Sequence, residues 1–109
     1  MANNFTFNGA SLTDATLTTI FTTTNKKVIV GLLCSNTGSA AINLSVKIDP
    51  DGTGASERFL VKNAAIPQNS SLEVISGKVV LPASGKIKAQ SSASGGDCDI
   101  NVSSIDGVS

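Results

Sequence analysis

The sequence has no histidine, no tryptophan and no tyrosine among its 109 residues. Histidine is the commonest general base and the usual partner of a catalytic serine or cysteine, so its absence removes the commonest catalytic arrangements. Paired carboxylates occur as Asp49 with Asp51 and as Asp97 with Asp99. Both pairs stand in turn sequences, where acids are usually solvated, whereas glycosidic cleavage needs one acid held in an apolar cleft. We therefore predict no catalytic residues and no enzymatic activity.

The chain also lacks an excess of charge, because eight basic residues balance eight acidic ones. A nucleic-acid-binding protein needs a basic face against the phosphates, and Lys26-Lys27 is the only pair of adjacent basic residues. No stretch approaches the roughly 20 apolar residues that span a bilayer, and residues 1–5 lack the basic and apolar regions of a signal peptide. We expect no nucleic-acid or membrane partner, synthesis in a cytoplasm and, since self-repulsion is absent, a homo-oligomer.

Cysteine is scarce, with only Cys34 and Cys98. In a cytoplasmic chain such residues are usually reduced and buried, which is the state that we predict, with a disulfide as the alternative. Without histidine or a CxxC motif, a zinc site is not expected. The segment Asp49-Pro50-Asp51-Gly52 lacks the third acid of a calcium loop and is expected to form a plain hairpin turn. We predict no metal and no cofactor.

The residues that are present alternate between apolar and polar with a period of two, which is typical of half-buried β-strands. The clearest examples are residues 42–48, 86–90 and 97–103. The last of these segments would place Cys98, Ile100 and Val102 on the inner face. In contrast, residues 28–34 are apolar almost throughout, which indicates a central strand that is covered on both faces, one of them by a partner.

Further strands are expected at residues 16–23, 57–62, 72–75 and 78–81, and turn sequences rich in Gly, Pro, Asn and Ser separate the strands at intervals of about ten residues. Seven or eight short strands at this spacing predict an all-β fold, an antiparallel β-sandwich or jelly roll. The length fits a single domain over residues 1–109.

The first dozen residues lack strong alternation, and residues 1–12 are therefore a candidate docking arm outside the sandwich. Phe5 and Phe7 are two of the four phenylalanines, and in an extended segment their spacing places both rings on one side. Aromatic side chains are strong anchors in protein interfaces, so both are candidate partner-binding residues. The alternative is that this segment is a first strand that completes its own sheet.

The order of the segments resembles that of short virion structural proteins of tailed bacteriophages. The similarity covers about residues 16–104 and consists of strands separated by a Pro-Asn-Ser turn and two Gly-Lys turns. The matching segments are residues 19–22, 27–37, 42–48, 59–67, 69–81 and 85–91, with the turns at Pro67, Asn69-Ser70, Gly77-Lys78 and Gly85-Lys86. The resemblance implies a β-sandwich located in the virion.

Two classes of function follow from these observations. The resemblance favours a non-enzymatic virion protein, foremost a capsid decoration (cement) protein bound to the major capsid protein, with a neck or tail component as the alternative. The other class is a receptor- or carbohydrate-binding β-sandwich. Sugar sites usually stack the ring on Trp or Tyr, and the chain has neither, which disfavours this second class.

Overall fold

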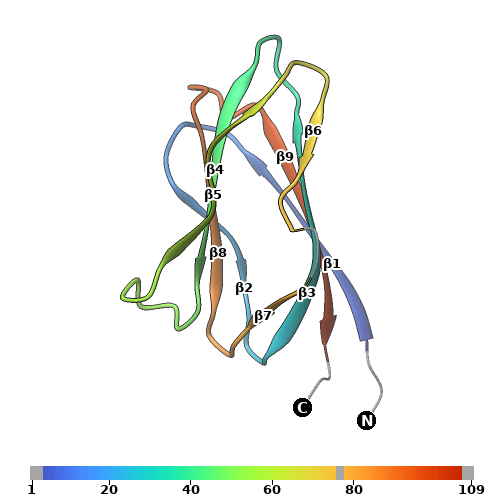
Figure 1. The fold of residues 1–109 in the computed structure, drawn as a ribbon, viewed down its shortest axis with the longest axis vertical. Helices are drawn as coiled ribbons and strands as arrows, with labels where there is room; N and C mark the ends of the chain where they lie inside the picture. Colours follow the sequence, from blue (N-terminus) through green and yellow to red (C-terminus); the bar gives the residue numbers. More distant parts are fainter. Residues whose placement is uncertain (1–3, 76–77, 107–109) are drawn as a thin grey trace.

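The alternating segments of the sequence form β-strands in the computed structural model, which describes residues 4–75 and 78–106. No helix occurs in this part of the chain. The strands are β1 (Asn4–Leu12), β2 (Thr18–Thr22), β3 (Lys27–Asn36), β4 (Ile42–Asp49), β5 (Arg58–Ile66), β6 (Ser71–Glu73), β7 (Val79–Leu81), β8 (Lys86–Ser91) and β9 (Cys98–Asp106). They form two antiparallel sheets that face each other (Figure 1), which confirms the predicted all-β sandwich.

The strand order identifies the topology. Sheet A runs β1-β9-β3-β6, with β7 also paired to β3, and sheet B runs β2-β8-β4-β5. Because β6 and β7 follow one another in the chain and both pair with β3, they share one position in sheet A. Each sheet then has four positions, in the order that defines a jelly roll. The described residues thus form nine strands, where seven or eight were predicted. The additional strand is β1, since β6 and β7 correspond to the two separate strands predicted at residues 72–75 and 78–81.

The core lies between the two sheets and is aliphatic. In β9 burial alternates as predicted, because Cys98, Ile100 and Val102 are buried while Asp99 and Ser103 are exposed. The fully buried large side chains come from both sheets and include Ile29, Leu32, Leu44, Ile66, Leu81 and Ile87. Burial of each such side chain stabilises the fold by about 1.5–3 kcal/mol relative to its exposure.

The two cysteines lie on the inner face of neighbouring strands of sheet A. Cys34 of β3 pairs with Ile100 of β9, and Asn36 pairs with Cys98. Both thiols are buried, as predicted, and neither forms a disulfide in this structure. Hydrogen bonding with Cys98, together with burial, raises the pKa of the Cys34 thiol. Because the thiolate is the reactive form, Cys34 is expected to react slowly.

The N-terminal segment corrects one prediction. Residues 4–12 pair with β9 at nine consecutive positions, from Asn4 opposite Asp106 to Leu12 opposite Cys98, without a register shift. Leu12 is also part of the core. The expectation of an arm outside the sandwich is therefore wrong for residues 4–12, which complete their own sheet, and residues 1–3 lie outside the described part. A role of this strand in docking stays a prediction.

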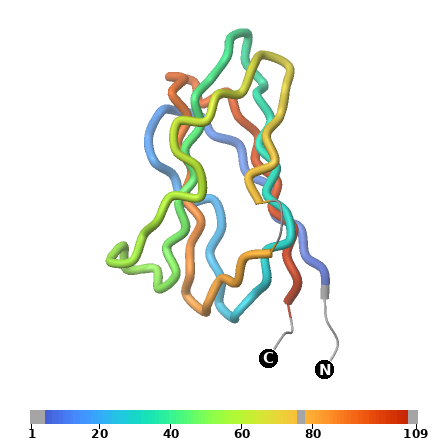
Figure 2. Tube along the Cα trace, viewed as in Figure 1, coloured from blue at the N-terminus to red at the C-terminus, as the bar shows by residue number. Residues whose placement is uncertain are grey.

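The connection between β4 and β5, residues 50–57, projects from the sandwich (Figure 2). It begins with the predicted turn, in which the Gly52 N–H donates to the Asp49 carbonyl at 3.3 Å. Gly52 has a φ of 74°, a left-handed conformation that favours glycine. The Asp49 carboxylate accepts a hydrogen bond from the Gly54 N–H at 3.0 Å, and the Asp51 carboxylate accepts one from the Thr53 N–H at 3.0 Å.

Candidate protein-binding surface

One row of paired residues on sheet A is apolar across four strands. Phe5 pairs with Ile105, Ile105 pairs with Val28, and Val28 pairs with Val80. Directly paired residues of neighbouring strands project from the same face of a sheet. Phe5, Ile105, Val28 and Val80, which we name the apolar row, therefore lie side by side on one face.

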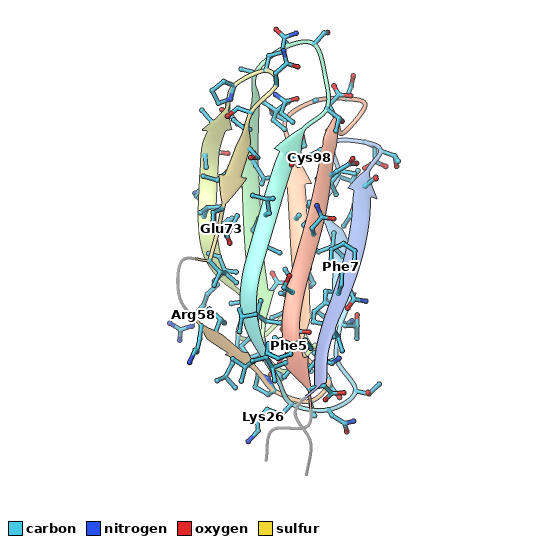
Figure 3. The ribbon with its side chains drawn as sticks, turned by 90° about the vertical axis from the view of Figure 1, so that its right-hand side faces the viewer. Phe5, Phe7, Lys26, Arg58, Glu73 and Cys98 are labelled. Carbon is cyan, nitrogen blue, oxygen red and sulfur yellow. The ribbon has the colours of Figure 1, made fainter. Side chains whose placement is uncertain are left out.

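That face points away from the core. The residues next to three members of the row in the sequence are buried between the sheets; they are Ile29, Leu81 and Ser104. Because successive side chains of a strand point to opposite faces, the row itself projects outward. Phe5 is 78% exposed and Val80 is 55% exposed. Figure 3 views this outer face of sheet A, with Phe5 at the end of the sheet where β1 begins and β9 ends.

A second ring adds to the row. Phe7 lies on the same face as Phe5, and it is 67% exposed. A methyl group built on Gly9 would lie 3.6 Å from the ring of Phe7, so this ring partly covers the glycine. Leu33 of β3 is a further exposed apolar residue of this face. Contiguous exposed apolar side chains of this kind mark interaction sites more often than isolated ones do.

The other end of the same face is polar. There Ser11 pairs with Asp99, Asp99 with Ser35, and Ser35 with Ser71. The Ser11 hydroxyl donates a hydrogen bond to the Asp99 carboxylate at 2.7 Å. The outer face of sheet A therefore changes from polar to apolar along its strands, and the apolar end is the candidate contact surface.

The outer side of sheet B presents charges that already have partners. Lys88 forms ion pairs with Glu57 and, at 3.3 Å, with the buried Asp49, and Lys47 lies 3.4 Å from Glu57. The hydrogen bond from Lys88 is the main cause that lowers the pKa of Glu57 from its ordinary 4.5. The same hydrogen bond raises the pKa of Lys88. This cluster fastens the 50–57 connection to β4 and β8.

The exposed ring of sheet B also has partners. Phe59 on β5 is 46% exposed, but the Lys47 Nζ lies 4.8 Å from its centroid and the Lys62 Nζ lies 5.3 Å from it. Cation–π contacts at these distances are favourable even at exposed sites. Phe5 and Phe7 have no cation within such a distance among the described residues, so their faces are available to another molecule.

Sheet B also has a polar hollow of about 280 Å³. Its lining consists of Ala15, Asn43, Ser45, Asn63, Gln90, Ser91 and Ser92. Asn63 has a φ of 53°, and its N–H donates to the Ser45 hydroxyl at 3.0 Å. The hollow offers amide and hydroxyl groups but no aromatic ring, so it can form hydrogen bonds with a polar ligand and cannot stack on one.

The sequence identified part of this surface. Phe5 and Phe7 do lie on one side of an extended segment, as their spacing predicted, and both are exposed. Val28 belongs to the two-sided apolar segment for which a partner was predicted. Val80 and Ile105 were missed, because only the strand pairing shows that they continue the row from Phe5.

Two further observations concern the described residues. No group of three or more His, Cys, Asp or Glu side chains there is placed to hold a metal ion. Within the same residues, no helix has the length and apolar character needed to cross a membrane.

The strand order of its two sheets makes this protein a small antiparallel jelly roll. No protein-family model and no curated protein sequence matches the chain. Among solved structures, it is similar to a chain of the T13 particle of infectious bursal disease virus, with a TM-score of 0.56 and 17% identity over 93% of this chain. It is also similar to the VP2 subviral particle of that virus, with a TM-score of 0.53 and 15% identity over 94% of this chain.

The chain spans about a third of those viral chains, 31% and 32% respectively. At these identities the similarity shows the fold alone. A pentameric capsid protein from metagenomic phage sequences also matches, with 22% identity over 94% of this chain and 60% of that protein, but its TM-score is 0.39, too low to support an inference.

Proposed function

We propose that this chain is a non-enzymatic structural protein of a virus particle, a capsid decoration (cement) protein that binds the major capsid protein. The observation that supports this function is the apolar row together with Phe7. Its outward rings and aliphatic side chains are suited to burial against another protein, since aromatic anchors contribute most to the stability of such contacts. The jelly roll is also a recurrent fold of viral capsid domains.

The location of the proposed contact follows from the contrast between the sheets. Lys47 and Lys88 of sheet B are ion-paired with Glu57 and Asp49, whereas Phe5, Phe7 and Val80 at the apolar end of sheet A are exposed in the isolated chain. We infer that sheet A faces the shell and that sheet B faces outward. The partner surface is expected to be apolar at its centre, because the row contains no charge to be matched.

The experiment measures the protein in purified particles of the virus that encodes it. Quantitative mass spectrometry gives the number of copies per particle, and a density map of the particle gives their position. Hundreds of copies on the outer shell would support the cement role. A few copies at one vertex would replace it with a neck or tail component, and absence from the particle would refute a virion role.

The contact surface has its own test. Shells assembled without the protein are mixed with the purified wild-type chain or with the double variant Phe5→Ser/Phe7→Ser, and the bound fraction is measured by co-sedimentation. The double variant should lose binding, because both anchors are removed. Phe59→Ser is the matched control, since it removes an exposed ring from the other sheet and should bind like the wild type.

A second candidate function is carbohydrate binding, and the polar hollow of sheet B is the observation that favours it. Asn43, Asn63 and Gln90 present amide groups, which can donate to and accept from sugar hydroxyls. Jelly rolls also occur in lectins. NMR titration with monosaccharides would test this function: shifts confined to the hollow and abolished by Asn63→Leu would support it, and unchanged spectra would exclude these sugars as ligands.

A further inference from the structure

The described residues form four sheet edges, and three of them are protected from pairing with another chain. Strand β2 has only five residues and a register shift between Thr19 and Phe21. The edge opposite β1 in sheet A is divided between β6 and β7, which have three residues each. Short or irregular edges of this kind discourage the addition of a further strand.

The third protected edge is β5, which is as long as β1. Its pairing with β4 has two register shifts, and Asn63 within it has a left-handed φ of 53°. It also presents the charged residues Arg58 and Lys62, both exposed. Irregular backbone and lysine or arginine on an edge are the common means by which proteins prevent unwanted strand pairing.

The edge at β1 has none of these protections. Its nine residues pair with β9 in unbroken register, and among the described residues no other strand pairs with it. The segment Asn4–Leu12 contains no charged residue and no proline. In Figure 3, β1 borders the sheet, with β9 on one side only. A long, regular and uncharged edge is a template for the addition of a strand.

We propose that β1 pairs antiparallel with β1 of a second copy of this chain, so that the two A sheets join into one continuous sheet across a two-fold axis. A two-fold contact requires a segment that is complementary to itself. The segment Asn4–Leu12 meets this requirement because it has no charge, so no register within it places like charges opposite each other. The chain as a whole has a net charge of zero, which removes long-range repulsion between copies.

The two faces of the sheet restrict the register. The outer side chains of β1 must stay on the outer face of the joined sheet, so odd-numbered residues pair with odd-numbered ones. The register centred on Phe7 places the two Phe7 rings opposite each other and places each Phe5 opposite Gly9 of the partner subunit. An aromatic ring opposite a glycine covers the exposed backbone there, as the ring of Phe7 partly does within one chain.

This inference does not depend on the proposed virion function, because it concerns the isolated chain in solution. The first measurement is sedimentation equilibrium of the full chain from micromolar to millimolar concentration. The second is hydrogen exchange of the backbone amides at both ends of that range. We expect a monomer–dimer equilibrium in which β1 amides that face away from β9 become protected as the dimer forms, while the amides of β5 do not change.

Two lysine variants complete the test. Phe7→Lys places two ammonium groups opposite each other across the two-fold axis and should raise the dimer dissociation constant at least about tenfold. Phe59→Lys, the same change on the protected edge, should leave that constant unchanged. Circular dichroism is used to check that both variants are folded.

Three results would overturn the proposal. The first is a monomer over the whole concentration range. The second is a dimer in which the β1 amides gain no protection, which would indicate packing through a face. The third is a folded Phe7→Lys variant that dimerises like the wild type.

Discussion

The two outer faces of this jelly roll differ in whether their side chains find partners within the chain. On sheet B, Lys88 is ion-paired to Glu57 and Asp49, and the ring of Phe59 is flanked by two lysines. On sheet A, Phe5 and Phe7 project into solvent, and the row that begins at Phe5 is apolar across four strands.

Folding alone does not account for every exposed apolar residue of this chain. Both sheets supply an inner face to the same core, so folding requires little of their outer faces. An outer face that meets only water tends to acquire polar and paired groups, as sheet B has. Retention of rings and aliphatic side chains on sheet A is therefore better explained by an interaction than by folding.

The largest loss of stability is expected from a charge placed on the inner face of sheet A. This variant tests whether the inner and outer faces of the sheet are assigned correctly. Ile100→Asp would place an unpaired charge in the core, because Ile100 is only 1% exposed. The cost should exceed about 4 kcal/mol, which is a large part of the stability of a small domain. We expect circular dichroism to show an unfolded or severely destabilised chain.

The neighbouring residue is the control. Asn101 projects outward from the same strand, so Asn101→Asp should change the free energy of unfolding by less than about 0.5 kcal/mol. Equal losses in the two variants would show that the register of β9 assigns the wrong residues to the core.

The second-largest loss of stability is expected from a substitution among the ion-paired residues of sheet B. Asp49→Ala removes a fully buried carboxylate that pairs with Lys88 and accepts the Gly54 N–H. The variant should lose about 2 kcal/mol in urea unfolding, since the Gly54 N–H loses its acceptor and Lys88 loses one of its two ion pairs. Asp99→Ala on sheet A removes an exposed carboxylate and should lose less than about 0.5 kcal/mol. Similar losses would mean that the ion pairs of sheet B do not distinguish the two sheets.

Most strands could be predicted from the sequence because their apolar residues face the core. The alternation at residues 42–48 became β4, and that at residues 97–103 became most of β9. The strand β1 was predicted only as the alternative to a docking arm, for the opposite reason. Its two rings face solvent, and its inner positions are small or polar until Leu12, so the pattern of apolar residues does not report the strand.

The candidate surface was predictable only in part, because a row across a sheet depends on strand register. Phe5 and Phe7 are conspicuous in the sequence as closely spaced rings. Ile105 and Val80 are separated from them by most of the chain. Only the pairing of β1 with β9, of β9 with β3 and of β3 with β7 brings all of them to one face. Sequence periodicity assigns a residue to a face of its own strand, not to neighbours on another strand.

Smaller losses of stability are expected from substitutions of two exposed rings, Phe59, which has lysine partners, and Phe7, which has none in the described part of the chain. Phe59→Ser removes contacts with both Lys47 and Lys62, and we expect a loss of about 1 kcal/mol in the free energy of unfolding. Phe7→Ser should cost less than about 0.5 kcal/mol in dilute solution, where the ring mainly meets water. A loss for Phe7→Ser that equals or exceeds that of Phe59→Ser would show that Phe7 serves the fold, and would remove it from the contact surface.

The smallest expected effect is a pH dependence that belongs to sheet B. The pKa of Glu57 is lowered in the folded chain, mainly by the hydrogen bond from Lys88. The ionised Glu57 therefore stabilises the fold at pH values above its ordinary pKa of 4.5, and this stabilisation is lost as the pH falls through the lower pKa of the folded chain. Urea midpoints of the wild type and of Glu57→Gln at pH 7 and pH 3 measure this contribution. The wild type should lose more stability than the variant between the two pH values, because only the wild type must protonate the Glu57 carboxylate. If both proteins lose the same amount, the Glu57 ion pairs contribute nothing to stability, and sheet B would owe its distinct character to Asp49 and to the lysines around Phe59.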